Sequence, residues 1–564
     1  MTTAANRFEG LLDRYFETLL QDAPTYATVM GIRSAEGKLG ELSARFYVKS
    51  ERERQAALRA LEDVSPRALS NEQQLDRLAL RSLLLKECED FARGRQTLEP
   101  HAPDHLLNIL FHELMRGDDE PHRAARNLRS LLEQAPDFLD EAAGLIRKPE
   151  RVWLQVMQQA VAGSAALLDG VGEFLANQSR RDERCAPGNS SGENKASRSS
   201  ALRKLADQAD NEDAATIRAT QKALHRYRDE AKARPLAPAN SFSVGTEALQ
   251  RRVRDELGLD YTLGQVESLA LGEVERVGAL LKAACARFGR KRSADDIIAE
   301  TRARWRPTKP LLQLYQETTR EVADGFRAAR AVTFPKGDEL VVKPVPEFLR
   351  TLIPTAAYTQ PGAFEKRQRG IFWINDLSVL KRTEAGKLAE QQQHFGLALT
   401  CAHEAYPGHH LQFVTQNRHA RKWRRLFAHA VFYEGWTLWC EQMMVDLKVD
   451  RSPWLRVQQL HDALWRCNRI LVDLRLQTGR YSCEQAVRHM QRHVGFTRAR
   501  AEADVNWYTA QPAVPMSYWL GRLENERLRQ RLMVGRGWSL QKFNDWLLSF
   551  GTVPQAWIEK YGID

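Results

Sequence analysis

Four residues that could bind a metal ion or assist its chemistry lie within one short stretch of the chain, Cys401–Phe413. The stretch reads Cys-Ala-His-Glu-Ala-Tyr-Pro-Gly-His-His-Leu-Gln-Phe, so that His403 and Glu404 are followed closely by His409 and His410. Imidazole nitrogens are common zinc ligands, and a glutamate directly after the first histidine serves as general base in helical zinc peptidases. The stretch therefore indicates a metal centre with a hydrolytic function.

A helix over Glu390–Ala402 is expected to carry this pair into the interior, because Phe395, Leu397 and Leu399 give the segment an apolar face. Unpaired charge is costly in an apolar core, so a buried histidine beside a glutamate needs a compensating partner. A bound divalent metal is one such partner.

The spacing of the histidines differs from the usual His-Glu-x-x-His helix, because the fourth position after His403 is Pro407. On an unbroken helix His409 would point away from His403, and His410 would lie about 10 Å along the axis. Proline removes a backbone hydrogen bond and glycine relaxes the dihedral limits, so Pro407 and Gly408 can distort the helix. We expect an inserted bulge that returns His409 to the face of His403.

A third ligand is expected from the aromatic-rich helix over residues 432–441, which carries Glu434 and Glu441 on one face. With His403 and His409, Glu434 would form a two-histidine, one-carboxylate zinc site that leaves a fourth position for water.

Two residues near this site have alternative interpretations. His410 is either the second ligand in place of His409 or a hydrogen-bond donor that supports the ligands. Glu441 is either such a supporting group or a carboxylate at the edge of the core.

On these residues the chain resembles the bacterial domain-of-unknown-function 885 family. The family signature, His-Glu-x-x-Pro-Gly-His-His followed by a Glu-Gly-Trp-Ala-Leu-Tyr-x-Glu-like helix, corresponds to residues 403–410 and 434–441. Residues 24–31, 271–276 and 515–521 fit its opening, middle and closing patterns, so the resemblance covers most of the chain.

The resemblance implies a branch of the gluzincin metallopeptidases. It implies His403, His409 and Glu434 as zinc ligands and Glu404 as the general base. The expected reaction is hydrolysis of an amide bond in a peptide or a peptide-like small molecule.

The tetrahedral oxyanion of such a reaction needs a hydrogen-bond donor besides zinc. Tyr518 is the first choice for this catalytic role, and Tyr508 is the second. The family usually has an arginine where this chain has Trp507, so substrate choice is expected to differ.

Helical periodicity runs through most of the sequence, which predicts a mainly α-helical single domain over residues 1–564. Residues 178–200 contain almost no core-forming side chain and predict a mobile surface loop. Residues 340–346 and 370–375 predict short strands of a small sheet beside the active-site cleft. By the gluzincin resemblance, residues 372–375 are expected to pair with an extended substrate. The alternative is that the two strands only form one side of the domain.

Composition argues against several other classes of protein. The net charge of +11 is modest for 564 residues, and basic side chains alternate with acidic ones, so no nucleic acid partner is expected. The first residues lack the pattern of a signal peptide, and no apolar run approaches the ~20 residues of a membrane span. Seven widely spaced cysteines favour free thiols in the cytoplasm, with Cys401 and Cys440 as small buried side chains.

Two other functions would use the same residues. Two histidines and one carboxylate also bind iron(II) in non-haem enzymes, although an oxygenase needs no glutamate base beside the first ligand. A catalytically inactive helical binding protein would keep the fold, and the missing arginine at Trp507 points weakly to it, whereas retention of Glu404 points to an enzyme.

Overall fold

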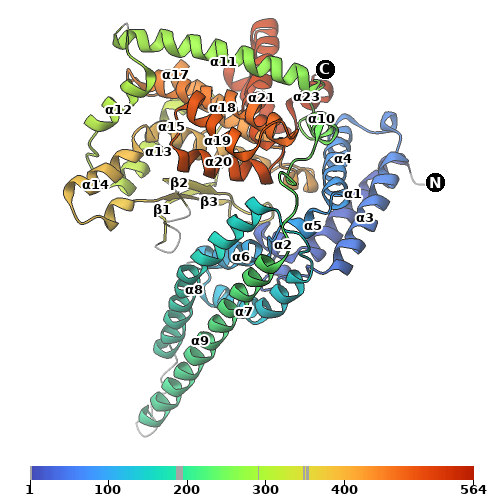
Figure 1. The fold of residues 1–564 in the computed structure, drawn as a ribbon, viewed down its shortest axis with the longest axis vertical. Helices are drawn as coiled ribbons and strands as arrows, with labels where there is room; N and C mark the ends of the chain where they lie inside the picture. Colours follow the sequence, from blue (N-terminus) through green and yellow to red (C-terminus); the bar gives the residue numbers. More distant parts are fainter. Residues whose placement is uncertain are drawn as a thin grey trace.

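The computed structural model describes residues 3–117, 119–185, 195–289, 291–346, 350, 353 and 355–563, with backbone only for 181–185 and 195–209. The fold is mainly helical, at 72% helix, with one three-stranded sheet, which confirms the predicted fold class (Figure 1).

The first part of the chain consists of helices alone. Its α-helices are α1 (Ala4–Asp22), α2 (Pro24–Val29), α3 (Ala44–Glu62), α4 (Asn71–Ala92), α5 (Arg95–Leu98), α6 (Ala102–Arg116), α7 (Pro121–Ala143), α8 (Arg151–Cys185) and α9 (Lys195–Ala233). The long helices α8 and α9 lie against each other and extend away from the main body (Figure 1). They occupy both ends of the loop predicted over residues 178–200, and its middle part, 186–194, lies outside the described residues.

The remaining helices form the main body. They are α10 (Thr246–Asp255), α11 (Leu263–Cys285), α12 (Ala294–Arg304), α13 (Leu311–Ala328), α14 (Glu384–Gln391), α15 (Leu397–Glu404), α16 (His409–Gln416), α17 (Ala430–Asp446), α18 (Leu455–Gln477), α19 (Cys483–Val494), α20 (Arg498–Ala510), α21 (Val514–Arg529), α22 (Leu540–Ser549) and α23 (Gln555–Gly562). Within this body α17 packs against α15 and α21, and α18 packs against α11 and α21.

The helix predicted over residues 390–402 is interrupted. Gly396 has a φ of +82°, in the left-handed region that glycine adopts readily, and α15 begins only at the next residue. The short helix α15 therefore carries His403 and Glu404 at its C-terminal end.

The sheet has the strand order β1-β3-β2, with β1 (Glu339–Pro344) parallel and β2 (Ala356–Thr359) antiparallel to β3 (Arg369–Ile374). Strands β1 and β3 were predicted from the sequence, whereas β2 was not. Because β3 pairs with a strand on each side, its backbone groups are already used. The prediction that residues 372–375 pair with an extended substrate is therefore wrong.

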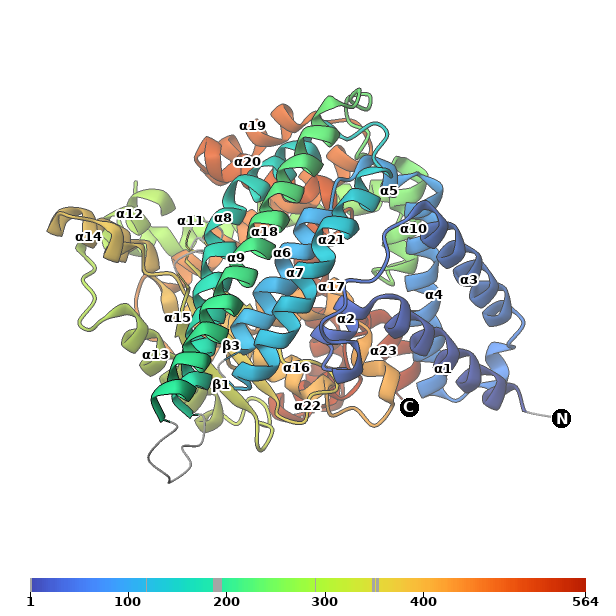
Figure 2. The same ribbon diagram turned by 90° about the horizontal axis from the view of Figure 1, so that it is seen from below.

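Helices cover both faces of β3, as its continuous apolar pattern requires. Trp373 packs against Phe111 of α6 on one face. Phe372 packs edge-on against Tyr315 of α13 on the other. Figure 2 shows α6, α7, α8 and α9 side by side over the part of the molecule that holds the sheet.

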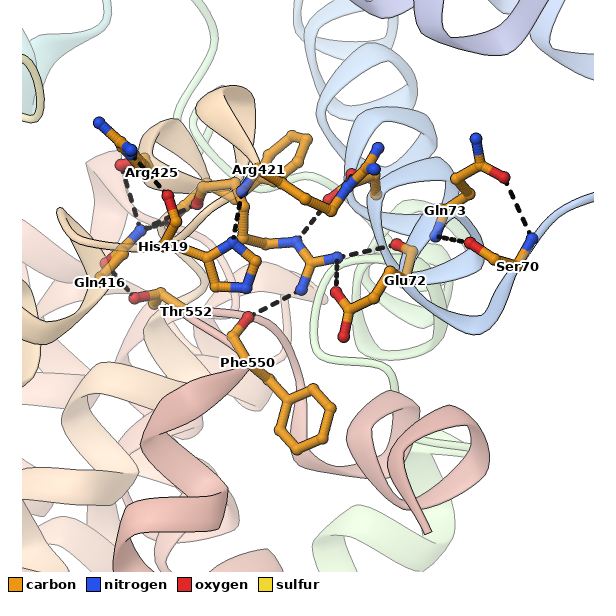
Figure 3. A network of polar contacts seen from close by, with 12 residues as sticks. Ser70, Glu72, Gln73, Gln416, His419, Arg421, Arg425, Phe550 and Thr552 are labelled. Atoms are coloured by element: carbon orange, nitrogen blue, oxygen red, sulfur yellow. Dashed lines mark hydrogen bonds and ion pairs between the residues drawn. The ribbon is translucent and has the colours of Figure 1, made fainter. Parts of the chain in front are cut away.

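A buried polar network fixes the position of α16. Arg424, in the segment between α16 and α17, is fully buried and forms an ion pair with the equally buried Asp76 of α4. The Gln416 amide, at the end of α16, donates to the carbonyl of Phe427 (2.6 Å), and the Thr552 hydroxyl donates to Gln416. Figure 3 shows how this network joins α16 to α4 and to the C-terminal segment.

Two predictions drawn from composition can be compared with the structure. The six cysteines with described side chains are free thiols, and Cys401 and Cys440 are fully buried as predicted. Among the described residues, no helix has both the length and the apolar character that crossing a membrane requires.

Candidate metal centre

The turn that joins α15 to α16 brings the two histidines together. The predicted bulge inside one helix is wrong, because α15 ends at Glu404 and a separate helix begins at His409. A Cβ on Gly408 would lie 1.8 Å from the carbonyl oxygen of His403, so only glycine permits this close approach. From α17, the Trp436 indole donates to the carbonyl of Pro407 (2.8 Å) and holds the turn in place.

Three side chains converge at this turn as predicted. One ligand atom from each of His403, His409 and Glu434 lies within 4.8 Å of the other two, and this group could hold a metal ion. The Nε2 atoms of His403 and His409 lie 3.7 and 3.8 Å from Glu434 Oε2. Ligands bound at 2.0–2.2 Å in a tetrahedron lie about 3.4 Å apart, so small movements would complete the site.

Unsatisfied polar atoms also fit a metal at this position. Glu434 Oε2 is buried and, among the described residues, has no hydrogen-bond partner. A buried acceptor without a partner is costly, and a cation between the two imidazoles would supply one.

Glu441 lies on the other side of His403. Its Oε1 is 2.8 Å from His403 Nδ1, while Arg466 Nη2 is 3.8 Å from the same oxygen. A proton on Nδ1 that is donated to Glu441 leaves Nε2 free to face Glu434 and His409. Of the two interpretations of Glu441, the geometry therefore favours the supporting group.

The electrostatics of the group call for a positive charge. Burial is the largest cause, and the neighbouring Glu434 and Glu441 the next, that together raise the pKa of Glu404 to about 8. Burial likewise raises the pKa values of Glu434 and Glu441 to about 7 and lowers that of His403 to about 3. The buried carboxyl groups of Glu434 and Glu441 and the partly exposed one of Glu404 lie beside neutral imidazoles, and a divalent cation would be strongly stabilised there.

His410 lies outside the three-residue group. Its ring is fully buried, with Nδ1 2.9 Å from the Tyr358 hydroxyl and Nε2 3.3 Å from Asp338 Oδ2. Gly370 of β3 leaves room for it, because a Cβ there would lie 2.5 Å from His410 Nδ1. His410 therefore ties α16 to the sheet, and it presents no free nitrogen to the metal group.

Helix α21 brings Tyr518 to Glu434 of α17. The Tyr518 hydroxyl hydrogen-bonds the Glu434 carboxylate, whereas the Tyr508 hydroxyl accepts from Arg469 Nε (2.9 Å) and donates to Asp504. Tyr508 is thus occupied away from the three ligands. The geometry favours Tyr518 over Tyr508 as a donor near the metal.

Sequence reasoning missed two arginines on α18. Arg466 and Arg469 are almost fully buried, and Arg469 lies over the rings of Tyr518 (4.4 Å) and Trp507 (5.5 Å). Thus an arginine does stand beside Trp507, but it comes from another helix. Two arginines three residues apart on a largely apolar helix were a signal that could have indicated them.

Comparison with known proteins places the fold and the family. No curated protein matches the chain. Two solved structures resemble it, described as "a putative lipoprotein of unknown function from Shewanella oneidensis" and "the putative lipoprotein from Colwellia psychrerythraea". Each is 18% identical with a TM-score of 0.72, over 99% of this chain and 100% or 99% of the other, and such a likeness shows the fold alone. Residues 24–561 match the family described as "Bacterial protein of unknown function (DUF885)", and the chain therefore belongs to this family.

Proposed function

We propose that the protein is a zinc-dependent hydrolase of the metallopeptidase type, which cleaves an amide bond in a peptide or a peptide-like small molecule. One observation carries the proposal. The group formed by His403, His409 and Glu434 could hold a metal ion, and Glu404 follows the first ligand directly without belonging to the group. A metal site that only stabilised the fold would not need this additional carboxylate.

His403, His409 and Glu434 would hold the ion through Nε2, Nε2 and Oε2. A zinc ion bound there supplies a Lewis acid, which polarises a carbonyl group and lowers the pKa of water toward ~7. The same three donors also suit iron(II). The glutamate beside the first ligand favours hydrolysis, because amide cleavage needs a group that moves a proton.

Glu404 is the proposed general base. It stands at the C-terminal end of α15, partly exposed, in a position to take a proton from the attacking water. It then delivers that proton to the leaving amine. Burial first, and then the neighbouring Glu434 and Glu441, favours the protonated form of Glu404 and raises its pKa. A cation bound beside it would favour the carboxylate, which is the form that accepts the proton.

Tyr518 is the proposed oxyanion donor. Burial and the neighbouring Glu434 raise the pKa of Tyr518 well above its usual value, so the phenol stays protonated at neutral pH. A protonated phenol beside the metal group can donate a hydrogen bond to the oxygen that becomes negative in the transition state.

Metal analysis and peptidase assays test the proposal together. Wild-type protein should contain about one zinc per chain, and His403→Ala should lose it. Glu404→Gln should keep the zinc while hydrolysis of a peptide library falls by about 10²–10⁴-fold. The matched control Glu384→Gln changes an exposed glutamate at the start of α14 and should leave both unchanged.

Three results would contradict the proposal. Full hydrolytic activity in Glu404→Gln would show that Glu404 is not the general base. Iron in place of zinc would favour an oxygenase. A wild-type protein that binds no metal after reconstitution would leave a helical binding protein.

A further inference from the structure

A second site lies apart from the metal centre. A cavity of about 880 Å³ opens between α3, α4 and the start of α10, and none of the three proposed metal ligands lines it. In Figure 1 α4 and α10 lie next to each other, away from α15 and α17. Cavities of 300–1,000 Å³ are typical of small-molecule sites.

Two arginines that line the cavity have buried donor atoms without hydrogen-bond partners among the described residues. Arg252 is 3% exposed; its Nη2 donates to Asp90, while its Nε and Nη1 are buried and have no hydrogen-bond partner in the described structure. Arg93 donates through Nη2 to the carbonyl of Ser243 (2.7 Å), and its Nη1 is equally buried and unpaired. Unpaired guanidinium N–H groups beside an open cavity are the donors that a carboxylate accepts from.

The N-terminus of α10 also lines the cavity. Gly245, its N-cap, supplies no side-chain cap, and no described atom lies within 4 Å of a Cβ built there. A ten-residue helix carries partial positive charge on its first free N–H groups. It therefore adds to the attraction that Arg93 and Arg252 exert on an anion.

Acidic groups line the same cavity. The Oε2 atoms of Glu51 (α3) and Glu256 (just after α10) are buried and have no hydrogen-bond partner among the described residues. Arg54 Nη1 lies 3.9 Å from Glu51 Oε2. Glu256 Oε2 lies 3.9 Å from Arg252 Nη1, too far for a hydrogen bond. These carboxylates would repel a multiply charged anion such as phosphate, and they offer acceptors for an ammonium group.

We propose that this cavity binds a small zwitterion, a free amino acid or a short unblocked peptide. Its carboxylate would lie at Arg93, Arg252 and the N-terminus of α10, and its ammonium group at Glu51. Leu85, Ala92, Val244 and Ala248 also line the cavity and provide apolar contact for a side chain. The site does not depend on metal binding or on hydrolysis, so its test is separate from that of the proposed function.

Titration calorimetry with the unblocked dipeptide Ala-Ala tests the site. The full-length His403→Ala protein serves as background, because it should not hydrolyse the probe. Arg93→Met removes an unpaired donor, and Ala92→Phe fills the cavity while every charge is kept. Each should weaken binding at least tenfold. Arg254→Met is the matched control, because Arg254 lies exposed on α10 and does not line the cavity.

The competing outcomes are distinct. Equal affinity in Arg93→Met and Ala92→Phe, with both variants folded by circular dichroism, would place the peptide elsewhere and overturn the proposal. Equal binding of N-acetyl-Ala-Ala-amide, or displacement by inorganic phosphate at equal concentration, would overturn the zwitterion assignment. The absence of binding at millimolar Ala-Ala would overturn the site itself.

Discussion

Gly435 of α17 and Gly521 of α21 face each other where the two helices cross. A Cβ on Gly435 would lie 2.6 Å from the carbonyl carbon of Gly521, and a Cβ on Gly521 would lie 1.9 Å from the carbonyl oxygen of Val431. This close crossing lies one residue from Glu434 and three from Tyr518. Two small residues thus set the distance at which Tyr518 meets the metal group.

Gly521→Ala should destabilise the fold by about 1–3 kcal/mol or more, because the added methyl group overlaps the backbone of α17. Urea denaturation measures the loss. Gly278→Ala in α11 is the matched control, since no described atom lies within 4 Å of the added methyl group, and it should be neutral or stabilise by up to ~1 kcal/mol. Equal effects of the two substitutions would contradict the close crossing.

Glu441→Gln should weaken metal binding about 10–100-fold, because a neutral amide holds the His403 imidazole less firmly in the tautomer that frees Nε2. Competition with a chelator of known affinity gives the change. Asp446, the last residue of the same helix, accepts a hydrogen bond from Gln442. The control Asp446→Asn should not alter the affinity for the metal. If Glu441 were only a carboxylate at the edge of the core, both variants would bind the metal equally.

His410→Gln should retain the metal, whereas His409→Gln should lose it. Both nitrogens of His410 are engaged by Tyr358 and Asp338, so its loss affects the seating of α16 on the sheet. Tyr358→Phe should accordingly cost about 1–3 kcal/mol of folding free energy and leave the metal content unchanged. Loss of metal in His410→Gln, with the protein still folded, would make His410 the second ligand.

Loss of the proton from Glu113 of α6 should lower the stability of the fold as the pH rises. Burial is the main cause that raises its pKa from 4.5 to about 7, and the hydrogen bond from Asn127 (3.0 Å) opposes the shift. The folded state therefore holds the proton more tightly than the unfolded state. The loss begins near pH 4.5, is complete above about pH 7, and amounts to ~3 kcal/mol at most.

Glu113→Gln removes this dependence, so it should be more stable than wild type at pH 8 and equal to it at pH 4. Thermal denaturation at the two pH values measures the difference. Glu141→Gln, at an exposed position of α7, should follow the wild-type profile. A Glu113→Gln stability difference that does not change with pH would contradict the assignment.

The ligand positions were predictable because the site is built from short motifs. His403, His409 and Glu434 could be named from residue type, and the pair Pro407-Gly408 indicated that the helix had to be distorted between the histidines. The amount of distortion was not predictable from those residues. Two helices instead of one bulged helix result from contacts with α17, where Trp436 binds the carbonyl of Pro407.

The sequence by itself determined which residues could hold a metal ion and that helices would carry them, because periodicity and residue type are local properties. Only the tertiary structure decided the role of His410, since its partner Asp338 is 72 residues away. It also decided that β3 lies inside the sheet, and that Arg469 and Gly521 border the site. Periodicity tells which face of an element is buried, but the element that covers this face is chosen by the packing of the whole chain.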